Sequence, residues 1–286
     1  MAIKIKKLHK KFGAEILNYK LSKDLNHKSF KEILKTFNEY GILLFRNQNL
    51  SIKNQVTFGR KFGKVLIHAV NQNHAKGHPE IYVLSNLDNT GKPSGKHPDQ
   101  GSLYWHTDGS WRKITGQATI MVADVIPSKG GETHFCCMEN AYDSLSDSMK
   151  LKIDNLFAIH NLDFSRNRRH GHDPLSKKQK NNAPPVIHPI VRTHPNTSRK
   201  SLFLGDHAEY IEDMNYLKGR SFIERLNKLA TKTQFIYKHK YKEGDVLVWD
   251  NRRLLHKGTK YDTANVKRVM RRTTIIGEAP KQIIDC

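Results

Sequence analysis

The sequence predicts a mainly β protein with flanking helices (α+β), organised as one β-sandwich or barrel. Short apolar runs bounded by turn residues recur along the chain and dominate its last third. Two amphipathic patterns with helical spacing precede them, near the N-terminus. The sequence contains no internal repeat and no clear linker, so we expect a single domain over residues 1–286.

The N-terminal part of the chain predicts two helices around a buried strand. Residues 29–40 carry apolar side chains at the i, i+3, i+4, i+7 spacing of an amphipathic helix, which Gly41 ends. The fully apolar run 42–45 predicts a buried strand. Ser51 is the expected N-cap of the second helix, and Gly63 is its stop.

The remaining segments alternate between short strands, turns and two further helices. We expect short strands within 3–21, a turn at 127–133 that leads into a strand, helices at 142–156 and 221–231, and strands at 81–84, 118–123, 190–193, 202–204, 234–239, 246–249 and 271–276. Residues 71–102 are rich in Asn, Gly, Pro and His, which predicts a lid loop beside a binding site. Residues 165–185 are rich in Arg, Lys and Asn and predict a mobile insertion.

The chain is strongly basic, with a formal net charge of +22. Its Lys residues are dispersed, and no zinc-finger or helix-turn-helix spacing is present. A basic field of this kind favours a small anion in a pocket over a nucleic-acid partner, although nucleic-acid binding is kept as the alternative.

The sequence shows no sign of membrane insertion or secretion. There is no run of 18 apolar residues, so we expect no membrane partner. The first residues lack a secretory h-region, and the three Cys form no C-x-x-C motif, which fits a reducing cytoplasm.

One stretch, Tyr104-Trp-His-Thr-Asp108, suggests a metal site. In an extended backbone His106 and Asp108 point to the same face, and a later His would complete a 2-His-1-carboxylate set with open coordination positions. Spacing alone does not single out this pair, because three more His-x-Asp/Glu triplets occur, at 78–80, 97–99 and 207–209. The first two contain Pro; the pair His207 and Glu209 is the competing candidate.

The C-terminal region brings further polar side chains to buried strands. Residues 246–256 read as a strand, a polar turn and a return strand that delivers His256. Downstream, alternation places Arg268, Met270 and Arg272 on one face. Two inward guanidinium groups would require a bound anion, such as a carboxylate or sulfonate. The alternative is a solvated edge strand whose arginines face water.

Four motifs in order resemble one family. W-H-T-D at 105–108, P-S-x-G-G-E-T at 127–133, W-D-N-R-x-x-x-H at 249–256 and R-x-x-x-R-x-T at 268–274 are similar to those of the taurine dioxygenase/chlorophenoxyacetate dioxygenase family. Its members are iron(II)- and 2-oxoglutarate-dependent dioxygenases. The resemblance implies a double-stranded β-helix (jelly roll, clavaminate synthase-like) with flanking helices.

The resemblance also implies roles for individual residues. His106, Asp108 and His256 would hold iron(II). Thr133 and Arg268 would bind the distal carboxylate of 2-oxoglutarate, in a pocket lined by Trp249. Arg272 would reach an anionic group of the substrate, helped by His68 and the backbone of Gly109. The two Arg could exchange roles, because both lie on one face.

The implied reaction uses dioxygen and 2-oxoglutarate to hydroxylate a small anionic organic substrate, releasing succinate and carbon dioxide. Suitable substrates are aryloxy- or alkyl-carboxylates, sulfonates and sulfate esters, with C–O or C–S cleavage where the hydroxylated carbon bears the heteroatom. The departures concern the substrate side: Gln100–Tyr104 differs from taurine dioxygenase, and the loop between His256 and Arg268 is one residue longer. A metal-dependent hydrolase on the same triad is a further alternative. The resemblance implies a homo-oligomer.

Overall fold

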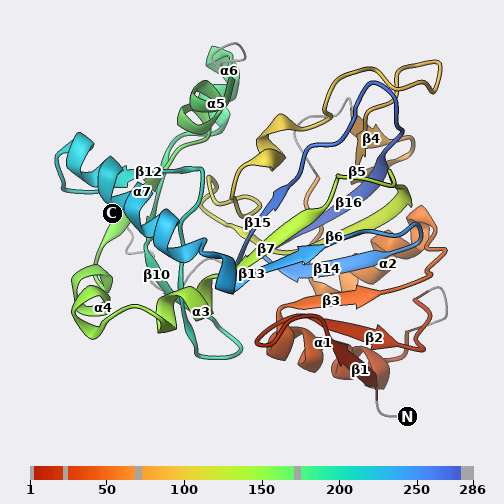
Figure 1. Ribbon diagram of the computed structural model, residues 1–286, viewed down its shortest axis with the longest axis horizontal. Helices are drawn as coiled ribbons and strands as arrows, with labels where there is room; N and C mark the ends of the chain where they lie inside the picture. Colours follow the sequence, from red (N-terminus) through yellow and green to blue (C-terminus); the bar gives the residue numbers. More distant parts are fainter. Residues whose placement is uncertain (1–2, 22–24, 68–72, 171–174, 278–286) are drawn as a thin grey trace.

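Two facing β-sheets form the centre of the protein. The computed structural model describes residues 3–21, 25–67, 73–170 and 175–277. The larger sheet has eight strands in the order β1 (Lys4–Lys7), β2 (Ala14–Leu17), β3 (Ile42–Phe45), β14 (Val246–Asp250), β6 (Gly116–Val125), β16 (Val269–Ile276), β5 (His78–Ser85) and β4 (His74–Ala75). Facing it is a sheet in the order β13 (Ile236–His239), β7 (Thr133–Cys137) and β15 (Leu254–Gly258) (Figure 1).

Period-two alternation decides which core each side chain enters. In β14, Val246 and Val248 pack with the N-terminal helices, whereas Leu247 and Trp249 point to the opposite face. There they join Phe135 of β7 in the core between the two sheets. The expected jelly roll is therefore the fold of this chain, with the central strands of the large sheet buried on both faces.

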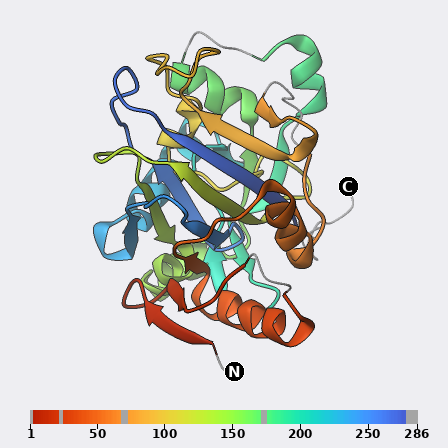
Figure 2. The same ribbon diagram turned by 90° about the vertical axis from the view of Figure 1, so that its right-hand side faces the viewer.

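Helices cover the outer face of the large sheet. α1 (His27–Tyr40) and α2 (Ile52–Phe62) lie against it in the turned view (Figure 2). They pack on it through Phe37, Phe58 and Phe62. The predicted signals are confirmed: Gly41 caps α1 at a φ of 71°, and the Ser51 side chain accepts a hydrogen bond from the third residue beyond it.

The residues between β7 and β13 form a second lobe. It contains α3 (Met138–Asp143), α4 (Asp147–Ile153), α5 (Leu162–His170), α6 (Lys177–Asn182), α7 (Tyr216–Ala230) and η3 (Thr233–Phe235). Its strands are β8 (Phe157–His160), β9 (Val186–Pro189), β10 (Val191–Thr193), β11 (Lys200–Leu202) and β12 (Ala208–Ile211). Figure 1 shows it beside the two facing sheets.

Several predicted elements in this lobe were wrong in their extent. The single helix expected at 142–156 is two helices, because Ser146 caps a new start by accepting from the Met149 amide. Helix α7 begins at Tyr216 rather than at 221, because Asn215 caps it and its first residues are exposed, which hides the apolar periodicity. The strand expected at 202–204 is β11, which ends at Leu202.

The two long segments contain more regular structure than was predicted, although the strand expected at 81–84 is confirmed within β5. Residues 71–102 include β4, most of η2 (Gln100–Leu103) and an eight-residue β5, although their role as a lid stays a prediction. Residues 165–185 contain most of α5 and all of α6, where Ser176 and Gln179 form a capping box. Sparse apolar side chains concealed both helices.

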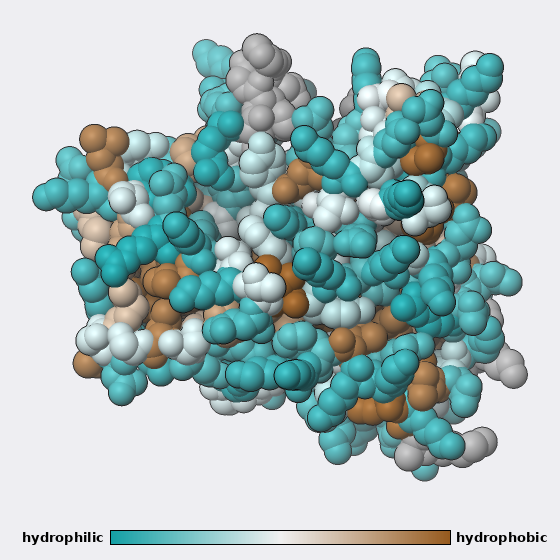
Figure 3. All heavy atoms as spheres, viewed as in Figure 1, coloured by the Kyte–Doolittle hydropathy of each residue, from teal (hydrophilic) through white to brown (hydrophobic). Residues whose placement is uncertain are grey.

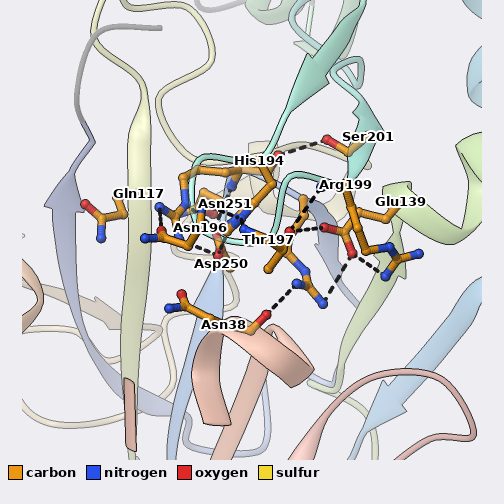
Figure 4. A network of polar contacts seen from close by, with 12 residues as sticks. Asn38, Gln117, Glu139, His194, Asn196, Thr197, Arg199, Ser201, Asp250 and Asn251 are labelled. Carbon is orange, nitrogen blue, oxygen red and sulfur yellow. Dashed lines mark hydrogen bonds and ion pairs between the residues drawn. The ribbon is translucent and has the colours of Figure 1, made fainter. Parts of the chain in front are cut away.

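A buried ion network fixes the turn between β14 and β15 (Figure 4). Glu139 is fully buried and accepts from Arg199 at 2.7 Å, and Arg253 lies 3.4 Å from it. The Arg253 guanidinium also donates to the carbonyls of Asn38 and Glu39, at the C-terminal end of α1. The turn that leads to β15 is thereby tied to the N-terminal helix.

The same turn is held from its other side by Asp250. This fully buried carboxylate lies 2.9 Å from His194 Nε2 and 2.7 Å from Arg252, close to Asn251 (Figure 4). Burial alone would raise the pKa of Asp250, but Arg252 and His194 keep it well below its usual range. The turn that leads to β15 is therefore held by ion pairs on both of its sides.

The surface agrees with the polar composition. On the face seen in Figure 3, hydrophilic residues predominate and hydrophobic ones are scattered. Within the described ranges, no helix combines the length and apolar character needed to cross a bilayer.

Two buried histidines make stability depend on pH. His160 and His188 are fully buried, with ring centroids 5.2 Å apart. Burial, aided by Arg192, lowers the pKa of His188 to about 3, and burial also places the pKa of His160 well below its ordinary value. The His188 ring is therefore neutral in the folded protein at pH 5, and burial favours the neutral form of His160 as well, whereas an unfolded chain would protonate both.

We expect His188 to lower the free energy of unfolding by about 2 kcal/mol between pH 7 and pH 5, because the unfolded state takes up more protons there, and His160 to act in the same direction. Urea titrations at the two pH values measure the effect. His188→Gln should remove the contribution of about 2 kcal/mol that is assigned to His188. A wild-type stability that does not change over this range would contradict the expectation.

Candidate metal centre

Two histidines and one aspartate converge in the structure. One ligand atom each from His106, Asp108 and His256 lies within 4.8 Å of the others, and this is the single such group among the described residues. His106 Nε2 is 3.9 Å from Asp108 Oδ1, and His256 Nε2 is 3.9 Å from Asp108 Oδ2. The three side chains predicted to share a metal therefore lie together.

Backbone pairing holds the two histidines side by side. The amide of His106 donates to the carbonyl of His256 at 3.0 Å, and the reverse hydrogen bond is 2.8 Å. This isolated antiparallel bridge attaches the 104–108 segment to the edge of β15, while Asp108 begins a turn. The planes of the two imidazole rings are tilted by 46° to each other, and their centroids lie 4.2 Å apart.

Protonation states suit metal ligation. Burial, reinforced by His106 and Arg272, lowers the pKa of His256 to about 3, so its ring is neutral at pH 7. Burial would raise the pKa of Asp108, but Arg272, both histidines and the Thr119 hydroxyl outweigh it and hold this pKa well below its ordinary value. Neutral imidazoles and an ionised carboxylate are the forms that bind a divalent cation.

Neighbouring groups orient each candidate ligand. Nδ1 of His106 lies 2.8 Å from the carbonyl of Tyr104, which can only accept, so Nδ1 carries the proton and Nε2 keeps its lone pair. Thr119 donates to Asp108 Oδ2 at 2.5 Å. Trp249 packs against His256 with centroids 4.8 Å apart. This donor set, with no fourth His, Cys, Asp or Glu beside it in the described ranges, fits an open iron(II) site.

Asn251 connects Thr119 with Trp249. Neither Asn251 nor Thr119 is among the site residues predicted from the sequence. The amide nitrogen of Asn251 donates to Thr119 Oγ1 at 2.9 Å, and its Oδ1 accepts from Trp249 Nε1 at 3.0 Å. Asn251 lies in the W-D-N-R motif, and Thr119 is a polar residue within an apolar strand. The motif is the sequence signal that points to Asn251, and the polar position within an apolar strand is the signal that points to Thr119.

Thr119→Val should weaken metal binding about 10- to 100-fold without unfolding the protein, because it removes the hydroxyl that holds Asp108 while preserving side-chain shape. Titration of the metal-free protein with Fe(II) or Mn(II) measures the dissociation constant. Thr273→Val serves as the matched control, since Thr273 is also fully buried in the same sheet but hydrogen-bonds Gln55. Equal affinities in wild type and Thr119→Val would contradict the assignment.

A second group of polar side chains includes Thr133 and Arg268, both almost fully buried. The Arg268 guanidinium donates to the Gly131 carbonyl at 3.2 Å, and its Nε has no partner in the described part of the chain. A Cβ at Gly131 would lie 3.0 Å from that Nε, so glycine permits the close approach. Burial lowers the pKa of Arg268, as expected where no carboxylate pairs with it.

Arg272 lies in β16, four residues after Arg268, and its side chain faces the candidate metal ligands. Its NH1 is 3.5 Å from Asp108 Oδ1, and its guanidinium carbon lies 4.9 Å from the Tyr82 ring centroid. Met270 between the two arginines is fully buried, whereas Arg271 points the other way and pairs with Asp124. The predicted alternation is confirmed, and the solvated edge strand is excluded because β16 lies between β6 and β5.

The remaining candidates are placed as follows. Gly109 stands in the turn after Asp108 at a φ of 73°. His68 lies outside the described residues. The competing pair is engaged elsewhere: His207 Nδ1 is 2.8 Å from Ser165 Oγ, and Glu209 accepts from Asn161 at 2.9 Å.

Comparisons with known proteins give a consistent picture. Residues 4–274 match the family described as taurine catabolism dioxygenase TauD, TfdA family. The chain is 33% identical over 289 residues to the alpha-ketoglutarate-dependent 2,4-dichlorophenoxyacetate dioxygenase of Cupriavidus pinatubonensis, covering 98% of this chain and 99% of that protein. It is 30% identical to the (S)-phenoxypropionate/alpha-ketoglutarate-dioxygenase of Sphingobium herbicidovorans, over 97% and 96% of the two chains.

Among solved structures, AAD-2 in complex with Mn(II) and N-oxalylglycine has a TM-score of 0.84 and 32% identity, covering 98% of this chain and 99% of that one. The similarity thus extends over both sheets and over every segment that carries a candidate ligand.

Proposed function

This chain belongs to the taurine catabolism dioxygenase TauD, TfdA family, and on that premise we propose that His106, Asp108 and His256 hold its iron(II) and that Arg268 and Arg272 bind two different anions. The protein is an iron(II)- and 2-oxoglutarate-dependent dioxygenase acting on a small anionic organic substrate. The convergence of the three ligand atoms within 4.8 Å carries the proposal.

When bound, iron with 2-oxoglutarate supplies the oxidising chemistry that lets dioxygen attack a C–H bond. The protein's share is placement. The Tyr104 carbonyl keeps the proton of His106 on Nδ1, and Thr119 holds one oxygen of Asp108. Trp249 and Phe135 enclose His256 and exclude water from that side of the site.

We assign the distal carboxylate of 2-oxoglutarate to Thr133 and Arg268. Both are buried, the Arg268 guanidinium is offset by no carboxylate in the described ranges, and a dicarboxylate would supply the missing charge. Trp249, buried beside His256, lines the path between the two ends of this cosubstrate. Of the two possible role assignments for the arginines, this one is favoured by the proximity of Arg268 to Gly131 and Thr133.

Arg272 would then receive the substrate's anionic group, with the Gly109 amide and His68 as proposed helpers. Its guanidinium faces Asp108 and stacks over Tyr82, so a substrate anchored there would present its next atoms to the metal side of the pocket. The relatives act on 2,4-dichlorophenoxyacetate and on (S)-phenoxypropionate, which favours an aryloxyalkanoate as substrate. Hydroxylation beside the ether oxygen would then lead to C–O cleavage.

A screen of small anions tests this function. Aryloxyalkanoates, alkyl sulfonates and sulfate esters are each added to protein with iron(II), ascorbate and 2-oxoglutarate, and succinate formation is followed. We expect one class to stimulate succinate release, with loss of activity on chelation and recovery on adding iron. Turnover that does not require oxygen would instead indicate a metal-dependent hydrolase. Metal-independent binding of nucleic acid would indicate a nucleic-acid-binding protein. Cytoplasmic location and homo-oligomer formation stay predictions; light scattering tests the latter.

A further inference from the structure

The hydroxyl of Tyr241 donates a hydrogen bond to Oγ1 of Thr133 at 3.1 Å. Both side chains are buried, Tyr241 being 4% exposed. The contact follows from register: Thr133 pairs with His239 at the end of β13, and Tyr241 comes two residues later. No part of the proposed function uses this phenol.

The direction of this hydrogen bond determines what Thr133 can do. A hydroxyl has one proton to donate and lone pairs with which to accept. A carboxylate in its ionised form only accepts, so Thr133 must donate to bind one. Because the phenol fills a lone pair of Oγ1, the Thr133 proton is left to point at a second acceptor. Oγ1 makes no other hydrogen bond within the described residues.

The phenol keeps its proton across the working pH range. Burial raises the pKa of Tyr241 to about 12, although Thr133 and Arg268 act in the opposite direction. Tyr241 and Tyr261 both lie near enough to Arg268 to influence its charge. The pocket therefore presents donors and a cation, which is the environment that a carboxylate requires.

We propose that Tyr241 is a positioning residue for 2-oxoglutarate: it holds the Thr133 hydroxyl so that its proton is donated to the distal carboxylate. This inference rests on the proposed function, in which Thr133 and Arg268 bind that carboxylate. Tyr241 itself touches neither the cosubstrate nor the metal. It acts through one oxygen atom of Thr133.

Four variants test the inference: Tyr241→Phe, Thr133→Val, Thr133→Ser and the double variant Tyr241→Phe/Thr133→Val. We expect Tyr241→Phe to raise KM for 2-oxoglutarate about threefold to tenfold, with kcat changed less than twofold, because one orienting hydrogen bond is lost. Thr133→Val should raise KM at least as much. The double variant should match Thr133→Val, since the phenol has nothing left to orient.

Two controls separate positioning from general damage. Tyr237→Phe removes a partly buried hydroxyl from β13, one that contacts His239 at 3.0 Å, and should leave KM unchanged. Thr133→Ser keeps the hydroxyl, so its KM should rise less than that of Thr133→Val and should rise further when Tyr241→Phe is added. Comparing Thr133→Ser with Thr133→Ser/Tyr241→Phe keeps the test valid even if Thr133→Val folds poorly.

The outcomes distinguish the inference from its premise. If Thr133→Val raises KM and Tyr241→Phe does not, the positioning role is wrong while the carboxylate site stands. If the double variant is worse than Thr133→Val, Tyr241 acts independently and the inference is also wrong. If Thr133→Val leaves KM for 2-oxoglutarate unchanged, the premise itself fails.

Discussion

His106→Ala is expected to abolish 2-oxoglutarate turnover. The imidazole is one of three groups that converge on a single point, and two remaining ligands cannot replace it. A bound metal contributes several kcal/mol of stabilisation to the reaction, and each 1.4 kcal/mol or so corresponds to a tenfold change in rate. We therefore expect at least about a 10³-fold loss of succinate formation, together with loss of iron from the purified protein.

The matched control is His78→Ala. His78 belongs to another His-x-Glu triplet of this chain, but it lies in β5 outside the convergent group. This variant should retain iron and activity. Full succinate formation by His106→Ala, with iron content equal to that of wild type, would refute the metal centre as assigned.

Crossed substitutions of the two arginines are expected to affect different ligands. Arg268→Met should raise KM for 2-oxoglutarate about 10- to 100-fold, because each lost hydrogen bond from a charged group costs roughly 1.5–3 kcal/mol. Arg272→Met should instead raise KM for the primary substrate by a similar factor and increase succinate formation that is not matched by product. Steady-state kinetics with each ligand varied in turn measures both.

The physical reason for the difference is position. Arg268 lies against Gly131, near Thr133, whereas Arg272 lies 3.5 Å from Asp108. The reverse pattern of KM changes would mean that the two arginines exchange roles. Equal effects of both variants on both ligands would mean that neither guanidinium is dedicated to one anion.

The helices and strands that bury one face, or both faces, could be predicted from the sequence because their apolar residues follow a regular spacing. Leu247 and Trp249 alternate with Val246 and Val248 as period two requires, and Gly41 marks a helix end through a backbone conformation that glycine readily adopts. Helices with few apolar residues, such as α6, have no such pattern and were missed.

For the site, spacing alone could not separate the His106/Asp108 pair from His207/Glu209. Four motifs in order did so through their resemblance to a family. Thr119 was not predicted because its role depends on strand register, which places it opposite Trp249 in the neighbouring strand. Tyr241 was not predicted either, because its contact with Thr133 forms only when β7 and β13, which are distant in the sequence, pair with each other.

The bridge between His106 and His256 has a consequence for how the enzyme matures. Its two halves come from distant parts of the chain, so chain entropy opposes their encounter until the intervening strands have paired. The newly made polypeptide consequently offers iron no organised binding place at early stages of folding. Metal capture should be a late step, and refolding followed by fluorescence should proceed at the same rate whether or not ferrous ion is present.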